Sequence, residues 1–378
     1  MFDIIVVGGG PVGSEVAFKT ASAGYSVAVT EQRKDYSSRV CCTGIVSLEC
    51  MSSFAIDDSL VKRKFSSATF FSPSGNKLSF ERKEPIACVL NRAAFDTFMA
   101  GRAIKTGVNY LFGAQVESLA FAPDRVQIQL KQGSEFSILE ARVAVIAAGA
   151  TSPIVRRFYE HHAMDSVMGA QAEVEAPGIE EIEIYCGKDI APDFFAWLVP
   201  VAGGRALAGL LTRKGTGNYM KKFLARLHGD GKIKTDVVDI NYRTIALRPP
   251  KRTYGDRLII VGGAAGQLKP TTGGGIYFGL LSAHIAAAVL NKALRSDGLS
   301  ASCLASYEVG WKDKLMPELN SGYLARTLYE HLSDGEINAL FSLTKTLDIE
   351  KCLSSMDDLS FDWHTGVISK LAKKYYNV

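Results

Sequence analysis

Three glycines near the amino terminus have the spacing of a phosphate-binding turn. Gly8, Gly10 and Gly13 form the pattern G-x-G-x-x-G, with Pro11 and Val12 before the last glycine. The first glycine of this pattern permits a tight turn, the second lets a pyrophosphate approach the backbone, and the third lets a helix pack on a strand. The amino terminus of that helix adds amide donors and a partial positive charge. The turn is therefore predicted to bind the pyrophosphate of a dinucleotide.

An acid follows this turn at the separation that a dinucleotide requires. Residues 2–7 form an apolar run of strand length, residues 14–23 have a helical pattern, and a second strand-like run over 25–30 ends in Glu31. An acid about twenty residues after the turn bonds the ribose of the adenosine. Gln32 follows it and is assigned to the same site. A glycine-rich turn in an ordinary α/β sheet would not explain where Glu31 stands.

Three later segments could also contribute to a binding site. One contains an arginine before a helix, and the other two are strands that end in small residues. Arg92 precedes a helical stretch over 93–105, where a surface arginine is the alternative, because a cation gains nothing from the dipole at the start of a helix. A strand over 141–148 breaks at Gly149 into a turn of small residues. The stretch over 259–280, IIVGGAAGQLKPTTGGGIYFGL, passes from a strand through glycines into a helix.

A thiol and an aromatic strand supply the remaining chemistry. Cys42 begins the sequence Cys-Thr-Gly-Ile, and a thiol beside a redox group could donate a proton, although a free cysteine is often a small buried hydrophobe. Phe195 and Trp197 share one face of a strand by alternation. Packing in the core is the alternative for both aromatic residues.

The composition limits the classes of protein to which this chain can belong. The chain has 378 residues, a net charge of +4 and seven cysteines, with 47% hydrophobic and 22% charged residues. These values suggest about two domains by length, and they indicate neither a nucleic-acid-binding surface nor a disulfide framework or a zinc or other metal site. No run of about 18 apolar residues predicts a membrane span. We therefore expect a cytoplasmic protein with reduced thiols.

Taken in order, the motifs resemble the successive FAD-binding motifs of flavoproteins related to p-hydroxybenzoate hydroxylase. Within that superfamily, the Cys42 loop, the strand over 194–200 and the block over 269–275 are most similar to the geranylgeranyl reductase family. The resemblance covers about residues 1–290. It implies an α/β fold with a Rossmann-type FAD-binding domain over 1–158 and 249–295. It further implies an inserted antiparallel-sheet substrate domain over 159–248 and a helical carboxy-terminal region over 296–378.

The resemblance also implies the roles of individual residues. Non-covalent FAD is expected to contact Gly8, Gly10, Pro11, Val12, Gly13, Glu31, Gln32, Cys42, Gly44, Arg92, Val116, Ala148, Gly149, Gly263, Gly274, Gly275 and Ile276. The substrate is expected to contact Phe195, Trp197 and Pro270. Cys42 is the candidate catalytic acid. Relatives carry aspartate where this chain has Gly263, so either another group bonds the ribityl chain here or FAD binding is weaker.

The implied activity is reduction of carbon–carbon double bonds in an isoprenoid lipid, by hydride transfer from reduced flavin N5. Electrons would come from NAD(P)H or a ferredoxin. The protein could touch the inner face of the membrane, for example through residues 370–376, for which a solvated helix end is the alternative. Two alternatives stay open: a flavin-dependent aromatic monooxygenase, and a non-catalytic or electron-transfer flavoprotein.

Overall fold

A computed structural model describes residues 1–37, 40–159, 164–354, 356 and 360–366 of the chain. The chain forms two compact units, each assembled from three separate segments. Unit 1 comprises residues 1–39, 92–166 and 245–319, and unit 2 comprises residues 40–91, 167–244 and 320–378. The expected boundaries near 158 and 248 lie close to two of these divisions, but residues 40–91 and 320–378 group with unit 2. How the units correspond to functional domains stays a prediction.

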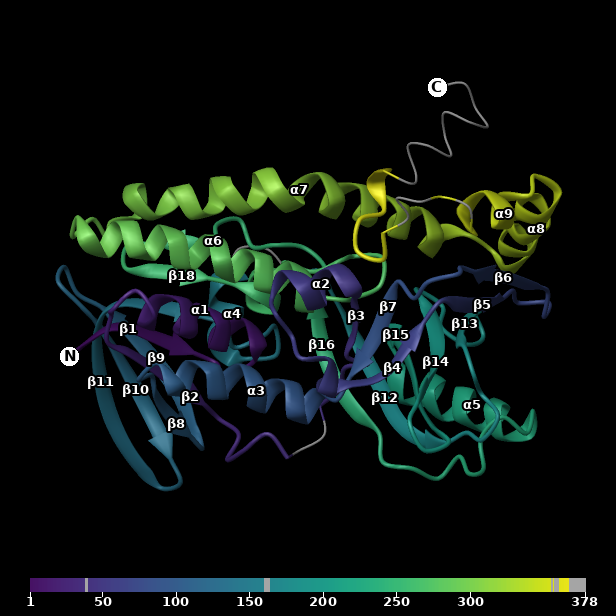
Figure 1. The fold of residues 1–378 in the computed structure, drawn as a ribbon, viewed down its shortest axis with the longest axis horizontal. Coiled ribbons are helices and arrows are strands. Elements are labelled where there is room, and N and C mark those ends of the chain that lie inside the picture. The colour runs from purple at the N-terminus through teal and green to yellow at the C-terminus, as the bar shows by residue number, and fades with distance from the viewer. Residues whose placement is uncertain (38–39, 160–163, 355, 357–359, 367–378) are drawn as a thin grey trace. The chain divides into compact units, whose positions relative to one another are not determined.

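Unit 1 contains an eight-stranded sheet (Figure 1). Six strands follow the order β17-β18-β11-β1-β2-β8, and β10 and β9 extend β11 as an antiparallel meander. The pairs formed by β1 with β11 and β2, by β2 with β8, and by β11 with β18 are parallel. The strands are β1 (Phe2–Val7), β2 (Val27–Glu31), β8 (Asn109–Phe112), β9 (Ala114–Phe121), β10 (Val126–Gln132), β11 (Glu135–Ile146), β17 (Tyr254–Gly255) and β18 (Leu258–Ile260).

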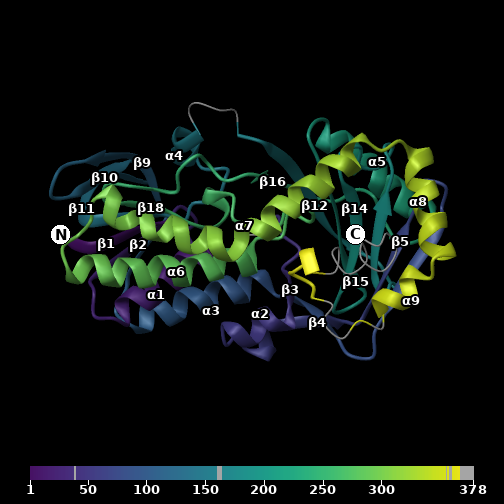
Figure 2. The same ribbon diagram turned by 90° about the horizontal axis from the view of Figure 1, so that it is seen from above.

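Helices cover this sheet because its central strands are apolar on both faces, as buried parallel strands require. All of residues 4–7 and 27–31 are buried. Helix α1 packs between α3 and α6, and Figure 2 shows the three helices next to one another. The helices and 3-10 turns of unit 1 are α1 (Pro11–Ala21), α3 (Arg92–Lys105), α4 (Pro153–Arg156), η2 (Arg157–Tyr159), η3 (Gly262–Ala265), α6 (Ile276–Arg295) and the first part of α7 (Ala301–His331).

Unit 2 is built on a seven-stranded sheet of order β16-β12-β15-β14-β13-β5-β6 and a three-stranded sheet of order β3-β7-β4. Its helices are α2 (Leu48–Ser53), η1 (Asp58–Leu60), α5 (Thr216–Gly229), the last part of α7, α8 (Asp334–Thr346) and α9 (Ile349–Ser354). Its strands are β3 (Ile45–Ser47), β4 (Val61–Phe65), β5 (Ser67–Phe71), β6 (Lys77–Glu81), β7 (Ala87–Leu90), β12 (Ser166–Glu175), β13 (Ile182–Cys186), β14 (Phe195–Val201), β15 (Arg205–Thr212) and β16 (Asn241–Ala246).

The seven-stranded sheet buries both of its faces. Alternate residues of β12, β14 and β15 pack with α5 in one core. On the other face, residues of β13, β14 and β15 pack with Phe65 and Val89 of the smaller sheet in a second core. The sheet is larger than the expected insertion, since β5 pairs with β13 in parallel and brings in β6. The segment 159–248 also holds the amphipathic helix α5, which the strand-like interpretation of that segment missed.

Helix α6 is the one helix among the described residues that is long and apolar enough to cross a membrane. It spans 20 residues, and 56% of its most apolar window is buried against the rest of the protein. Its packing against α1 gives it the environment of a core helix.

Candidate functional site

The glycine turn between β1 and α1 has the geometry that the sequence predicts. Gly8 adopts a φ of 106°, and a Cβ atom there would lie 2.6 Å from the carbonyl oxygen of Ala147. A Cβ on Gly13 would collide with the carbonyl oxygen of Gly8. A Cβ on Gly10, in contrast, would meet nothing within 4 Å. Two glycines therefore allow close backbone packing, and the third leaves open space where a phosphate could approach.

The amino terminus of α1 is suited to an anion. Gly10 is its N-cap and Pro11 its first residue, no side chain caps it, and its first turn carries no acid. Because neither a capping oxygen nor a carboxylate occupies this end, the helix dipole and the first backbone amides can act on a bound pyrophosphate. Pro11 and Val12 hold the positions expected of them in this turn.

Glu31 ends β2 and is bonded to the glycine turn. Its side chain is buried, and its Oε2 atom accepts the backbone N–H of Gly9 at 3.0 Å. Its Oε1 atom accepts from the backbone N–H of Arg33 at 2.9 Å and from the Arg33 Nε at 3.0 Å. Gln32, which was assigned to the same site, is exposed. Arg33 Nη2 also donates to Oε2, at 3.3 Å, so the carboxylate is held in place at both of its oxygens.

Asp96 links the expected Arg92 to Arg33, a residue that sequence reasoning missed. Arg92 Nη2 donates to Asp96 Oδ1 at 2.7 Å, and Arg33 Nη1 donates to Asp96 Oδ2 at 3.2 Å. Asp96 is 1% exposed, so this bridge replaces its hydration. Its position two residues after Glu31 is the sequence feature that could have identified Arg33. Glu31, Arg33, Asp96 and Arg92 form one chain of ion pairs.

The hydroxyl groups of two tyrosines form hydrogen bonds at the glycine turn. Tyr36 donates its hydroxyl to the carbonyl oxygen of Gly9, and the Tyr110 hydroxyl lies 2.6 Å from Ser14 Oγ. Ser14 Oγ also donates to the Gly9 carbonyl, at 3.1 Å. Burial raises the pKa of Tyr110 to about 12 and that of Tyr36 further, so both keep their protons at neutral pH. The backbone of Gly9 is therefore fixed at both its N–H and its C=O.

The second glycine block is anchored by a buried glutamine. Gln267 Oε1 accepts the backbone N–H of Gly262 at 2.7 Å, and its Nε2 donates to the Tyr307 hydroxyl at 2.9 Å. Tyr307 in turn donates to the carbonyl oxygen of Ile260 at 2.9 Å. These contacts show that α7, which carried no diagnostic motif, helps to shape the block. Gly262 has a φ of 70°, whereas Gly263 is outside the left-handed region.

Gly263 and Gly149 come together at the ends of neighbouring strands. A Cβ on Gly263 would lie 3.8 Å from the Cα atom of Gly149, an ordinary van der Waals distance. Ala148 precedes Gly149, and Val116 packs in the adjoining core from β9. Helix α6 begins at Ile276 after the N-cap Gly275, so Gly274, Gly275 and Ile276 lie at a helix amino terminus as expected. The cofactor roles of these residues stay predictions.

Unit 2 holds the remaining candidates except Pro270. The Cys42 Sγ atom accepts the backbone N–H of Gly44 at 3.4 Å, and Cys41 donates its thiol to the carbonyl oxygen of Gly169 at 3.8 Å. Phe195 and Trp197 lie edge to face, with ring centroids 6.3 Å apart, which confirms that they share one face of β14. Pro270 is buried in unit 1. The roles of Cys42, Phe195, Trp197 and Pro270 stay predictions.

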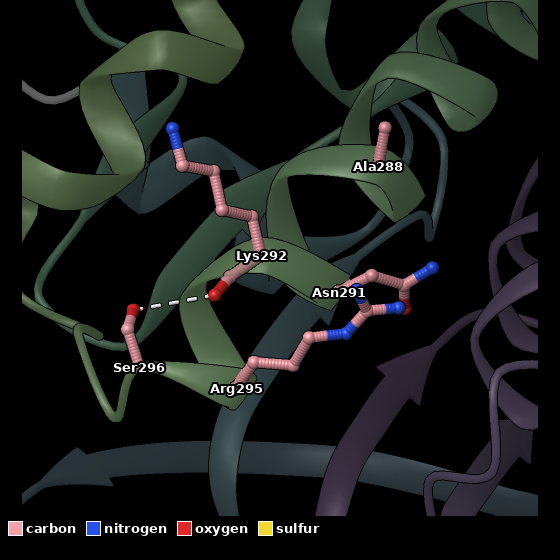
Figure 3. Close-up of a pocket in the computed structure, with 5 residues that line it drawn as sticks. All are labelled: Ala288, Asn291, Lys292, Arg295 and Ser296. Carbon is pink, nitrogen blue, oxygen red and sulfur yellow. Dashed lines mark hydrogen bonds between the residues drawn. The ribbon is translucent and has the colours of Figure 1, made fainter.

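A depression of about 510 Å³ lies at the other end of α6 from its amino terminus (Figure 3). It is lined by Ala288, Asn291, Lys292, Arg295 and Ser296. At about 1.5 Å per residue, Arg295 is more than 25 Å along the helix axis from Ile276. Lys292 and Arg295 place two positive charges at the carboxy-terminal end of the helix dipole, where cations are favoured. The depression is therefore separate from the glycine turns.

Comparison with known proteins identifies relatives along nearly the whole chain. The family model described as lycopene cyclase protein matches residues 3–343. A digeranylgeranylglycerophospholipid reductase of Methanocaldococcus jannaschii is 29% identical, over 92% of each chain. Digeranylgeranylglycerophospholipid reductase 2 of Methanothermobacter thermautotrophicus is 27% identical, over 95% of this chain and 94% of the relative.

A solved structure shows the same fold. The geranylgeranyl bacteriochlorophyll reductase-like protein of Thermoplasma acidophilum superposes with a TM-score of 0.86 at 22% sequence identity, covering 100% of this chain and 96% of that one. The expected fold class, an α/β flavoprotein fold with a helical carboxy-terminal region, is confirmed by this likeness. The resemblance to geranylgeranyl reductases that the motifs indicated is likewise confirmed by the relatives.

Proposed function

The chain belongs to the lycopene cyclase protein family, and from that premise we propose that it is an FAD-dependent oxidoreductase that reduces carbon–carbon double bonds of an isoprenoid lipid. The observation that carries this proposal is the match to named digeranylgeranylglycerophospholipid reductases across more than nine-tenths of both chains. Two further observations support the proposal that FAD binds here: the hydrogen bond between Gly9 and Glu31, and the open space at Gly10.

The residues of unit 1 fit FAD. The α1 amino terminus and Gly10 would receive the pyrophosphate, and Glu31 would accept a hydrogen bond from the adenosine ribose. The amino terminus of α6 would supply amide donors to the pyrimidine end of the ring. FAD bound in this way supplies the hydride of the reaction. The Glu31–Arg33–Asp96–Arg92 chain keeps the ribose end of the site preorganised before the cofactor arrives.

An apolar lipid fits the side chains of unit 2. The face of the seven-stranded sheet that carries Phe195 and Trp197 continues into Val199, Leu207 and Ile182, which share a hydrophobic core. Phe195 and Trp197 are themselves only partly buried, so a hydrocarbon chain packed against them would gain free energy. We propose that the protein acts as a cytoplasmic enzyme, peripheral at the inner face of the membrane, where it would meet such a lipid. The expected membrane contact at residues 370–376 lies outside the described residues. The electron donor in this proposal is NAD(P)H or a ferredoxin.

A single-turnover experiment tests the proposed activity. The FAD-loaded protein is reduced anaerobically and mixed with a geranylgeranyl lipid or with its fully saturated counterpart. The unsaturated lipid should reoxidise the flavin, and the saturated lipid should leave it reduced. Reoxidation by neither lipid would contradict the proposal.

Cyclisation of an isoprenoid is a second candidate, which the family match favours. A cyclisation rearranges bonds without consuming reducing equivalents, whereas a reduction adds two hydrogen atoms for every double bond. In the same experiment, a cyclic product of unchanged mass with the flavin still reduced would select cyclisation.

A further inference from the structure

One position on the seven-stranded sheet of unit 2 carries a tryptophan that lies flat over a glycine. Trp197 of β14 pairs with Gly209 of β15, and Gly209 pairs with Gln171 of β12. A Cβ on Gly209 would lie 2.6 Å from Cε2 of the indole. The glycine therefore lets the indole ring reach across β15 toward β12.

Gln171, Gly209 and Trp197 share one face of the sheet. Their neighbours along the strands, such as Ala170, Ala208 and Leu198, pack with α5 on the opposite face. Because side chains alternate along a strand, the three residues project away from α5. Trp197 also packs with Val199 and Leu207, so its own surroundings are apolar, while the ion pair of Arg205 with Glu173 lies farther along the same face.

Two polar atoms on this face have no hydrogen-bond partner among the described residues. They are the indole Nε1 of Trp197, a donor, and the Oε1 of Gln171, an acceptor, and both are buried. The Gln171 residue is only 5% exposed. Buried polar atoms in folded proteins are almost always bonded, to protein, to water or to a ligand. A donor and an acceptor on one apolar face therefore indicate a group that can bond both.

The chemistry of that group follows from the two atoms. A hydroxyl accepts a hydrogen bond from the indole and donates one to the carboxamide, whereas a carbonyl or an ether oxygen could satisfy only the indole. An ionised group is disfavoured, because burying a charge among Val199 and Leu207 costs far more than burying a neutral group. A neutral O–H is thus the group that satisfies both atoms.

We propose that Trp197 and Gln171 form a subsite for a neutral hydroxyl oxygen on the apolar face of the unit 2 sheet. The oxygen belongs either to an alcohol group of the lipid, an assignment that rests on the proposed function, or to a bound water. The thiol of Cys41 lies beside the same face, since a Cβ on Gly169, two residues before Gln171, would be 3.9 Å from its Sγ. The subsite adds one directional contact to the apolar surroundings of Trp197.

Binding measurements with two matched lipids distinguish the two sources of the oxygen. Geranylgeraniol and its methyl ether differ in one property that matters here, because the ether accepts a hydrogen bond but cannot donate one. If the lipid supplies the hydroxyl, the FAD-loaded protein should bind the alcohol about tenfold more tightly than the ether. Gln171→Leu should abolish that preference, and Trp197→Phe should weaken both ligands by a similar factor. Leu207→Val, on the same face, is the control and should leave the preference intact.

A crystal structure of the FAD-loaded, lipid-free protein gives the second readout and does not depend on any variant folding. If water supplies the hydroxyl, the two lipids should bind equally, and an oxygen should lie within about 3.2 Å of both Nε1 and Oε1. Equal binding together with a direct bond between Trp197 and Gln171, or with other protein atoms on both, would overturn the subsite. A preference for the alcohol that survives Gln171→Leu would overturn it as well. Failure of both lipids to bind, with the water in place, would contradict the proposed function and leave the subsite standing.

Discussion

The backbone N–H of Gly9 donates to the Oε2 atom of Glu31 at 3.0 Å, so the acid at the end of β2 is bonded to the turn that follows β1. The two strands are parallel neighbours, which places their carboxyl ends at one edge of the sheet. A dinucleotide in this turn would meet its pyrophosphate donors and its ribose acceptor as one preassembled unit.

Replacement of Glu31 by alanine should weaken FAD binding by about 1.5–3 kcal/mol, because the carboxylate is a charge-assisted acceptor for the ribose. Titration of the apoprotein with FAD, followed by quenching of flavin fluorescence, measures the change. Thermal unfolding of the two apoproteins serves as a control, since Glu31 also bonds Gly9 and Arg33. Equal FAD affinity in variant and parent would mean that Glu31 does not contact the cofactor.

Asp96→Asn should destabilise the apoprotein by about 3 kcal/mol, because it removes the buried carboxylate that holds two arginines. Arg33 and Arg92 would each lose an ion pair that is largely shielded from water. Urea unfolding monitored by circular dichroism gives the free energy of unfolding. Asp58→Asn, whose pair with Lys64 is exposed, is the matched control and should change stability by less than about 1 kcal/mol. A loss at Asp96 as small as at Asp58 would contradict this role.

Gly263→Asp should tighten FAD binding by roughly twofold to tenfold, the effect of one added hydrogen bond to the ribityl chain. Gly263 lies outside the left-handed region, and its new Cβ would meet only the Cα atom of Gly149, at 3.8 Å, so the backbone accepts a side chain there. The matched control is Gly262→Ala. With a φ of 70° and Val12 Cγ1 3.0 Å from its added Cβ, this variant should loosen FAD. Weaker binding by Gly263→Asp would show that the position is not a vacated hydrogen-bond site.

Gly209→Ala should displace the Trp197 indole and cost about 1–3 kcal/mol of stability, the range for overpacking a core. A shift of the tryptophan emission spectrum should accompany the loss. Gly101→Ala is the control, because its added Cβ meets nothing within 4 Å inside helix α3. That variant should gain about 0.5–1 kcal/mol from helix propensity. An unchanged emission spectrum in Gly209→Ala would contradict the flat packing of the indole.

Cys41 should react slowly with iodoacetamide between pH 7 and 9, because burial raises the pKa of its thiol to about 12. At pH 8 only about one thiol in ten thousand is then the reactive thiolate. Mass spectrometry of the labelled peptides measures the rate, with the exposed Cys303 as the internal reference. Labelling of Cys41 as fast as Cys303 would contradict the burial.

The sequence predicted those parts of the site that depend on local patterns. The turn at Gly8 and the end of β2 at Glu31 follow from glycine spacing and from strands whose residues are nearly all apolar. Arg33 was missed because its role comes from Asp96, which is 63 residues away in the chain. Gln267 was missed for a similar reason, since its partner Tyr307 lies on α7.

The insertion of the second sheet was predicted only in part. The strand-like pattern over 159–248 indicated β12 to β16, but the pairing of β13 with β5 joins segments more than a hundred residues apart. No local periodicity reports such a pairing, because each strand pattern is compatible with many partners. Helix α5 was missed because its amphipathic pattern lies within a run of strand-like segments.

The mass of the product tests the central claim most directly. The FAD-loaded protein, reduced anaerobically in excess over a geranylgeranyl lipid, is allowed to react to completion, and the lipid is analysed by mass spectrometry. The account predicts a gain of two hydrogen atoms for each double bond reduced, with an equivalent of flavin oxidised each time. An unchanged lipid mass, or the gain of an oxygen atom when air is admitted, would contradict it.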